Sequence, residues 1–169
     1  MRRPESSDLN FKGLFYVTGT GQAKVTGMTL DGNVQNYGNL EINTSIIEAG
    51  IYGYINNRGT LTLNDTDFTT ASGQATSQTY DAITNTKVMN INNSNIYVDH
   101  NSSYRYYVNG INNTGTLNIT DNSNIYVGSD ILKTYRYRAI YTAGTSNVMI
   151  KDSNIYTKGG TMNYGIYID

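Results

Sequence analysis

A short pattern of hydrophobic and polar positions recurs six times along the chain. Two aliphatic residues separated by one position are followed by a polar turn and by a third apolar residue, seven positions after the first in five copies and eight in the other. Successive copies begin 17, 21, 28, 28 and 31 residues apart, which predicts a solenoid. The copies are Ala23-Val25-Leu30, Leu40-Ile42-Ile47, Leu61-Leu63-Phe68, Met89-Ile91-Ile96, Leu117-Ile119-Ile125 and Val148-Ile150-Ile155.

Each copy predicts two short strands joined by a turn. The alternation of residues 60–63 places Leu61 and Leu63 on one face and the two threonines on the other. Residues 64–67 are Asn, Asp, Thr and Asp, whose short side chains favour turns. Phe68 then begins a second inward row.

A third apolar segment precedes the copies, which completes a coil of three strands. The segments Ile55–Leu61 and Ile111–Leu117 differ at one position. Abundant Asn, Thr, Gly and Tyr, without a 3.6-residue period, argue against helices. The coils are longer and more variable than those of a left-handed hexapeptide helix. We therefore predict one all-β domain over residues 1–169, a right-handed parallel β-helix solenoid of about six coils.

The variable lengths predict protruding loops, and the two ends of the chain predict a longer protein. The extra residues fall within 68–83, 96–111 and 125–140. The charged residues 1–8 have no apolar run behind them, so we expect no signal peptide, and the apolar residues within 9–16 predict an N-terminal cap or tail over residues 1–16. Residues 164–169 resemble the start of another coil, so we expect the C-terminal end to be truncated.

Three segments of the sequence resemble a known class of repeats. "INNRGTLTLNDTDF", "INNTGTLNITDNSNIYV" and "AKVTGMTLDGN" are similar to repeats of bacterial surface proteins and autotransporter passengers with a pectin-lyase-like β-helix. The similarity covers roughly Tyr16 to Asp169. It implies an exported adhesin or stalk at the bacterial cell surface. Carbohydrate-active enzymes, structural fibres and phage tail components share such folds, so these alternatives stay open.

The amino-acid composition argues against several kinds of partner and binding site. The net charge of −1 argues against nucleic acid, which needs a basic surplus. The absence of cysteine excludes disulfides and thiolate metal sites. No apolar stretch has the length of a membrane helix, so we expect no membrane insertion in this segment. The sequence predicts no cofactor. A hydrophobic fraction of 38% is low for a globular domain, but a thin solenoid tolerates it.

Carboxylates recur at one position of the repeat. Asp65, Asp121 and Asp152 each lie four residues after the first apolar residue of their copy. Asp121 and Asp152 fall on neighbouring coils, where a shared cation is conceivable. A carbohydrate-active enzyme would use these acids, together with Asp67, on an outer face. Asn93 fills the same position, which favours turn chemistry, so we expect no metal site and no catalytic residue.

An aligned row of tyrosines is the best contact candidate. Tyr97, Tyr126 and Tyr156 each follow the third apolar residue of their copy, and alternation points them outward on three successive coils. Such a row suits stacking on sugar rings or on a partner protein. The alternative is that cross-strand stacking simply stabilises the sheet. The aromatic row is confined to the C-terminal half.

A second aromatic set contains arginines. Residues 104–107 and 135–138 read Tyr-Arg-Tyr-Tyr and Tyr-Arg-Tyr-Arg, and we expect them in matching loops of neighbouring coils. Arginine packing over tyrosine faces and binding of an anionic glycan are both open. Arg105 and Arg136 are the expected donors flanking the tyrosine row. The expected partners are a host glycan or surface protein, with end-to-end or lateral self-association as a further possibility.

Overall fold

The chain folds into three parallel β-sheets that wrap around one core. The computed structural model describes residues 9–72, 79–100, 107–129 and 136–169. Sheet A consists of β1 (Asn10–Lys12), β4 (Thr29–Asp31), β7 (Ile46–Ile51), β10 (Asp67–Ser72), β13 (Asn95–His100), β16 (Asn124–Gly128) and β19 (Asn154–Lys158). Sheet B consists of β2 (Phe15–Val17), β5 (Val34–Asn36), β8 (Ile55–Asn57), β11 (Thr79–Asn85), β14 (Tyr107–Asn113), β17 (Arg136–Thr142) and β20 (Met162–Ile168). Sheet C consists of β3 (Gln22–Thr26), β6 (Asn39–Asn43), β9 (Thr60–Asn64), β12 (Val88–Asn92), β15 (Thr116–Thr120) and β18 (Asn147–Ile150).

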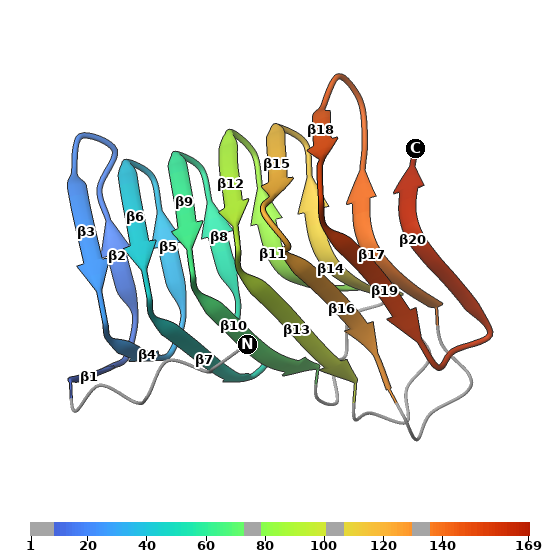
Figure 1. Ribbon diagram of the computed structural model, residues 1–169, viewed down its shortest axis with the longest axis horizontal. Helices are drawn as coiled ribbons and strands as arrows, with labels where there is room; N and C mark the ends of the chain where they lie inside the picture. Colours follow the sequence, from blue (N-terminus) through green and yellow to red (C-terminus); the bar gives the residue numbers. More distant parts are fainter. Residues whose placement is uncertain (1–8, 73–78, 101–106, 130–135) are drawn as a thin grey trace.

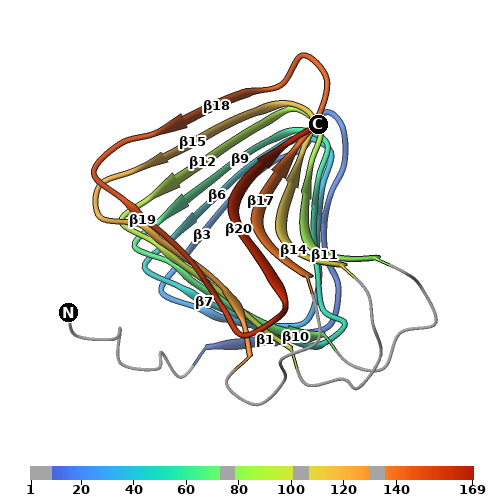
Figure 2. The same cartoon turned by 90° about the vertical axis from the view of Figure 1, so that its right-hand side faces the viewer.

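The order of strands confirms the predicted solenoid. Each coil gives one strand to sheet B, one to sheet C and one to sheet A, from β2–β4 to β17–β19, with β1 before and β20 after these six triplets. Adjacent coils lie side by side along the long axis (Figure 1). Seen from the C-terminal end, the chain runs anticlockwise as it advances towards the viewer, so the coil is right-handed (Figure 2).

Aliphatic rows fill the interior because equivalent residues of successive coils pair in register. Leu40, Leu61, Met89 and Leu117 form one such row in sheet C, and all four are fully buried. Burial of a side chain of this size stabilises the fold by about 1.5–3 kcal/mol. The corresponding rows are Ile47, Phe68, Ile96 and Ile125 in sheet A, and Ile55, Ile83, Ile111 and Ile140 in sheet B.

A ladder of buried asparagines follows the corner between sheets B and C. Asn36, Asn57, Asn85 and Asn113 are each fully buried. The Nδ2 of each of the first three donates to the Oδ1 of the next, at 2.8, 2.7 and 2.6 Å. The same three nitrogens also donate to backbone carbonyls of the next coil, at 2.7–2.9 Å. The buried amides are thereby satisfied, as burial requires.

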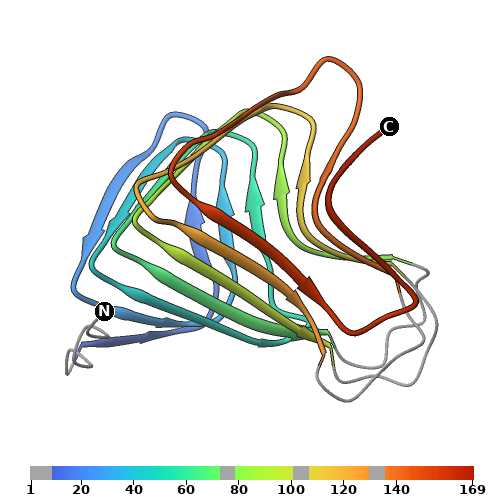
Figure 3. The ribbon, with the colours of Figure 1, turned by 45° about the vertical axis from the view of Figure 1, so that its right-hand side comes forward.

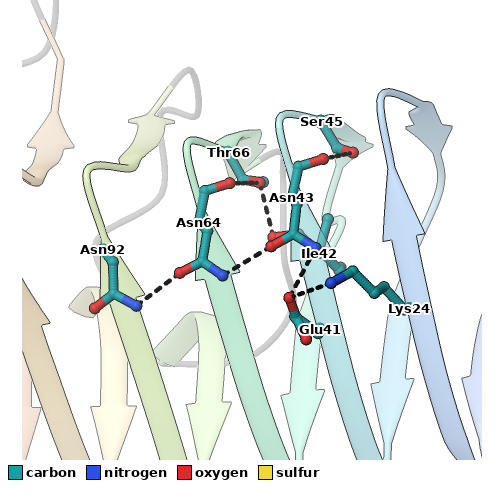
Figure 4. A network of polar contacts seen from close by, with 8 residues as sticks. All are labelled: Lys24, Glu41, Ile42, Asn43, Ser45, Asn64, Thr66 and Asn92. Atoms are coloured by element: carbon teal, nitrogen blue, oxygen red, sulfur yellow. Dashed lines mark hydrogen bonds and ion pairs between the residues drawn. The ribbon is translucent and has the colours of Figure 1, made fainter.

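A second asparagine ladder follows the corner between sheets C and A. Asn64 donates to Asn43 and Asn92 donates to Asn64, both at 2.7 Å (Figure 4). Beside it, the buried hydroxyl of Thr66 donates to the Asn64 carbonyl oxygen at 2.9 Å and to that of Ile42 at 3.1 Å. Asparagine ladders therefore link neighbouring coils in the middle of the stack, from β5 to β14 at one corner and from β6 to β12 at the other.

Sheet B bends inward in the C-terminal half of the molecule (Figures 2 and 3). Here the strands are seven residues long, against three in β2, β5 and β8. At the bend, small residues precede the inward isoleucines. A Cβ at Gly110 would lie 2.5 Å from Cγ2 of Val127 and 2.7 Å from the Ala139 carbonyl oxygen, so a larger residue does not fit. The other small residues of this row are Ala82, Ala139 and Gly165.

Two expectations about loops and ends are modified. Strands β11, β14 and β17 of sheet B begin at Thr79, Tyr107 and Arg136, so part of each segment predicted as a protruding loop is strand. Residues 73–78, 101–106 and 130–135 of these segments lie outside the described residues. In the segment predicted as an N-terminal cap or tail, β1 and β2 form the first strands of sheets A and B.

Replacement of one asparagine tests the buried ladder. Asn85→Ala removes the acceptor of the Asn57 amide, and it removes the side-chain donor to Asn113 Oδ1 and to the Thr116 carbonyl oxygen. We expect a loss of about 2–3 kcal/mol in the free energy of unfolding, measured by urea denaturation. Asn118→Ala, on the outer face of β15, is the matched control and costs less than about 1 kcal/mol. Equal losses in the two variants contradict the assignment.

Candidate functional site

The predicted tyrosine row lies on the outer face of sheet A. Tyr97, Tyr126 and Tyr156 pair in register in β13, β16 and β19. Tyr97 is 44% exposed and Tyr156 is 52% exposed. The ring centroids of Tyr97 and Tyr126 lie 6.2 Å apart with the planes tilted by 46°. The structure thus brings the three rings together on one face, at the spacing of successive coils.

A row of amides runs beside the tyrosines. Asn95, Asn124 and Asn154 lie two positions before the tyrosines on the same strands, with Asp67 at the same register in β10. Asn95 donates to Asp67 at 2.6 Å, Asn124 donates to Asn95 at 2.8 Å, and Asn154 donates to Asn124 at 3.0 Å. These bonds hold the side chains in a row that runs alongside the row of tyrosines. The strip combines apolar ring faces with hydrogen-bonding groups held in one orientation.

The row of carboxylates occupies a strained turn position. The backbone φ is 49° at Asp65, 45° at Asn93, 58° at Asp121 and 49° at Asp152. This left-handed conformation is one that Asn, Asp and Gly adopt more readily than other residues. The equivalent positions hold Thr44 and Gly27, with φ of 48° and 64°. Backbone conformation therefore accounts for five of the six residues in the row, and Thr44 is the exception.

The extra residue of the fifth copy also lies in this turn. Asp121 and Asn122 both have positive φ, 58° and 62°, before the chain enters β16. The Asp121 carboxylate accepts a hydrogen bond from Thr120 Oγ1 at 2.9 Å, and that of Asp152 lies 3.9 Å from Lys151 Nζ. In the part of the chain that the structure describes, no group of three or more His, Cys, Asp or Glu residues could hold a metal ion.

The second aromatic set is built differently from the prediction. Tyr107 lies in β14, and Arg136 and Arg138 lie in β17, so these residues belong to strands rather than loops. Arg105 lies outside the described residues. Arg136 is on sheet B, whereas the tyrosine row is on sheet A. It donates from Nη1 to the Tyr107 hydroxyl instead.

Arg138 is the centre of an aromatic cluster that the loop assignment missed. Its guanidinium carbon lies 4.1 Å from the ring centroid of Tyr107, 4.2 Å from that of Tyr167 and 5.0 Å from that of Tyr141. The rings of Tyr141 and Tyr167 are stacked, with centroids 5.9 Å apart. In a strand, residues two positions apart point to the same face, so a strand assignment for this segment places Arg136 and Arg138 on one face.

The hydroxyl of Tyr141 is engaged by an acid. It donates to Asp169 Oδ2 at 2.9 Å. This hydrogen bond is the main cause that raises the pKa of Tyr141 above its usual value; partial burial adds to the shift, and the nearby Arg138 opposes it. Tyr141 therefore remains a neutral aromatic surface over the physiological pH range.

An open depression lies near the N-terminal end of sheet C. It has a volume of about 260 Å³ and is lined by Gln22, Ala23, Lys24, Asn39 and Glu41. Lys24 Nζ lies 2.9 Å from Glu41 Oε1 (Figure 4). Hydrogen bonds from Lys24 and Asn43 lower the pKa of Glu41. The charges of Lys24 and Glu41 thus neutralise each other. The other residues that line the depression, Gln22, Ala23 and Asn39, are not titratable.

No protein-family model, curated protein or solved structure matches this chain. The fold assignment therefore rests on strand order and register. Within the described ranges, no helix has the length and apolar character needed to span a membrane.

A role in the turn and a role in cation binding predict different effects on stability when Asp121 and Asp152 are replaced. We expect the double variant Asp121→Gly/Asp152→Gly to stay within about 1 kcal/mol of the parent, because glycine adopts the left-handed conformation without strain. Thermal unfolding in Ca²⁺ and in a chelator gives the same midpoint for both proteins. A Ca²⁺-dependent rise in midpoint that the double variant loses would establish a cation site instead.

Proposed function

We propose that this chain is a non-catalytic segment of a bacterial cell-surface adhesin or structural stalk, with a contact strip for glycans or a surface protein on sheet A. The parallel β-helix supports the first part, because stacked coils give a rigid rod whose outer rows repeat at fixed spacing. The resemblance of its repeats to those of bacterial surface proteins supports an extracellular location.

The single observation that carries the contact strip is the row of Tyr97, Tyr126 and Tyr156. The tyrosines pair in register on successive strands, which lie about 4.8 Å apart, and the ring centroids of Tyr97 and Tyr126 are 6.2 Å apart. Tyrosine supplies large contact area at low cost in conformational entropy. The parallel row of fixed amides beside the rings can donate and accept hydrogen bonds with sugar hydroxyls.

Alternative functions receive less support from the described residues. The acids that a carbohydrate-active enzyme would use include Asp65, Asp121 and Asp152, and these occupy left-handed turn positions. Asp67 accepts the first hydrogen bond of the amide row. No observation in the described ranges favours catalysis over a contact surface. A purely structural fibre or phage tail component shares the rod but leaves the confinement of the tyrosines to the C-terminal half unexplained.

Removal of the rings tests the contact strip. The triple variant Tyr97→Ala/Tyr126→Ala/Tyr156→Ala should weaken binding to a host-glycan array or to cells by tenfold or more. Its free energy of unfolding should fall by no more than about 2 kcal/mol, since each cross-strand aromatic pair contributes about 0.2–1 kcal/mol. Thr69→Ala, in the same outer row of β10, is the control and keeps full binding.

The opposite pattern identifies a structural role for the tyrosines. Unchanged glycan and cell binding together with a large loss of thermal stability shows that stacking serves the sheet alone. Binding by the intact protein should also be measured after Tyr→Phe replacement at the three positions. Retention there shows that the ring faces, rather than the hydroxyls, make the contact.

A further inference from the structure

The arginine cluster of sheet B is separate from the tyrosine strip and has its own chemistry. Arg138 lies in β17, between Tyr107 of the preceding coil and Tyr167 of the following coil. The distances of 4.1 and 4.2 Å to their ring centroids place aromatic rings from both neighbouring coils against the guanidinium. Such cation–π contacts hold an arginine in place without neutralising its charge.

Apart from its ring contacts, the Arg138 guanidinium has no hydrogen bond at Nε and no ion pair with a carboxylate of the described residues. Its Nε is buried and has no hydrogen-bond partner. The ion pairs among the described residues are Lys12–Asp31, Lys24–Glu41 and Lys151–Asp152, so no carboxylate of this part of the chain lies within ion-pair distance of Arg138. A guanidinium offers a planar fork of N–H donors suited to an oxyanion.

The nearby acids are already engaged by other groups. Asp81 shares the register row of Arg138, two coils away, and accepts hydrogen bonds from Asn109 at 2.6 Å and Asn112 at 2.8 Å. Asp169 accepts from Tyr141. Arg136 adds a second positive charge two positions along β17, and its guanidinium carbon lies 5.3 Å from the Tyr107 ring centroid.

A buried acceptor accompanies this donor. Asn109 pairs in register with Arg138 and is 2% exposed, and its Oδ1 has no hydrogen-bond partner. The outer face of sheet B is concave here, because β14, β17 and β20 bend inward (Figure 2). A buried donor and a buried acceptor, both without hydrogen-bond partners, thus lie on paired residues of neighbouring strands in this concave face. Ligands that combine an oxyanion, hydroxyl groups and a ring fit this arrangement.

We propose that the Arg138 cluster binds the carboxylate or sulfate group of an acidic polysaccharide. The terminal N–H groups of Arg138 donate to the oxyanion, and Arg136 strengthens the attraction. The ring edges of Tyr141 and Tyr167 contact the sugar to which the oxyanion is attached. This site does not depend on the tyrosine strip of sheet A, so either site can bind in the absence of the other.

Charge-specific binding assays test this site. The whole chain is titrated against immobilised polygalacturonate, dextran sulfate, neutral dextran and polyglutamate at low and high salt. We expect binding to at least one of the two acidic polysaccharides, weakened by salt. Polygalacturonate and dextran sulfate distinguish a carboxylate from a sulfate ligand. Arg138→Gln should weaken this binding by about tenfold or more, as expected for loss of a charge-assisted contact.

A matched variant separates the site from general charge. Arg58→Gln removes an exposed arginine that lies 5.7 Å from the ring centroid of Tyr37, and its binding should stay within about twofold of the parent. Arg138→Lys retains the charge without the planar fork and should give a partial loss. If Arg138→Gln does not fold, judged by circular dichroism, the lysine variant decides the question.

Several results would overturn the proposal. They are no binding to either acidic polysaccharide, equal losses for Arg58→Gln and the Arg138 variants, or no loss when Arg138 is replaced. Polyglutamate bound as tightly as the polysaccharides would replace the proposed ligand class with an acidic peptide. The triple tyrosine variant should keep its acidic-polysaccharide binding, which distinguishes a failure of this site from a failure of the strip on sheet A.

Discussion

The buried asparagine ladder at the corner between sheets B and C is the constraint on which the register of the coils depends. Each amide of Asn36, Asn57 and Asn85 donates both to the next asparagine and to a carbonyl of the next coil. A slip of one residue would move these amides out of line and turn polar side chains into the aliphatic rows. Because an unpaired buried amide costs about 1–3 kcal/mol, the slip is opposed at each of the four coils that the ladder joins, from β5 to β14.

The outer surface inherits this register. Once the inward rows are aligned, every outward residue lies beside its equivalent in the neighbouring coil, so identical residues form rows and interactions between them add to an alignment that is already set. The tyrosines of sheet A and the amides beside them are aligned in this way. On sheet B the same alignment places Arg138 between tyrosines of two other coils. The chemistry of each face follows from a few positions of the repeat.

The aliphatic pattern was sufficient to predict the strands, the solenoid and the outward direction of Tyr97, Tyr126 and Tyr156. It also predicted the turn role of Asp65 and Asp152, because Asn93 occupies the same position. These features depend on local alternation and on spacing, which a sequence displays directly.

Features that arise from packing between coils were not predicted. Asn57 and Asn85 are polar residues that point inward, and a hydrophobic pattern cannot distinguish them from turn residues. At the bend of sheet B the buried residues Ala82 and Ile83 are adjacent, which breaks the period of two. The start of the strand was therefore placed too late in the sequence, and Arg138 was assigned to a loop.

The register can be tested most directly by nuclear Overhauser spectroscopy of the isotope-labelled protein. The account predicts contacts between the side-chain amide of Asn85 and those of Asn57 and Asn113, together with slow hydrogen exchange of these amides. It also predicts ring contacts between Tyr97 and Tyr126 in the same spectrum. Contacts displaced by one or two residues, or buried amides that exchange as fast as the amide of Asn118, would contradict the register and the arrangement of both outer faces.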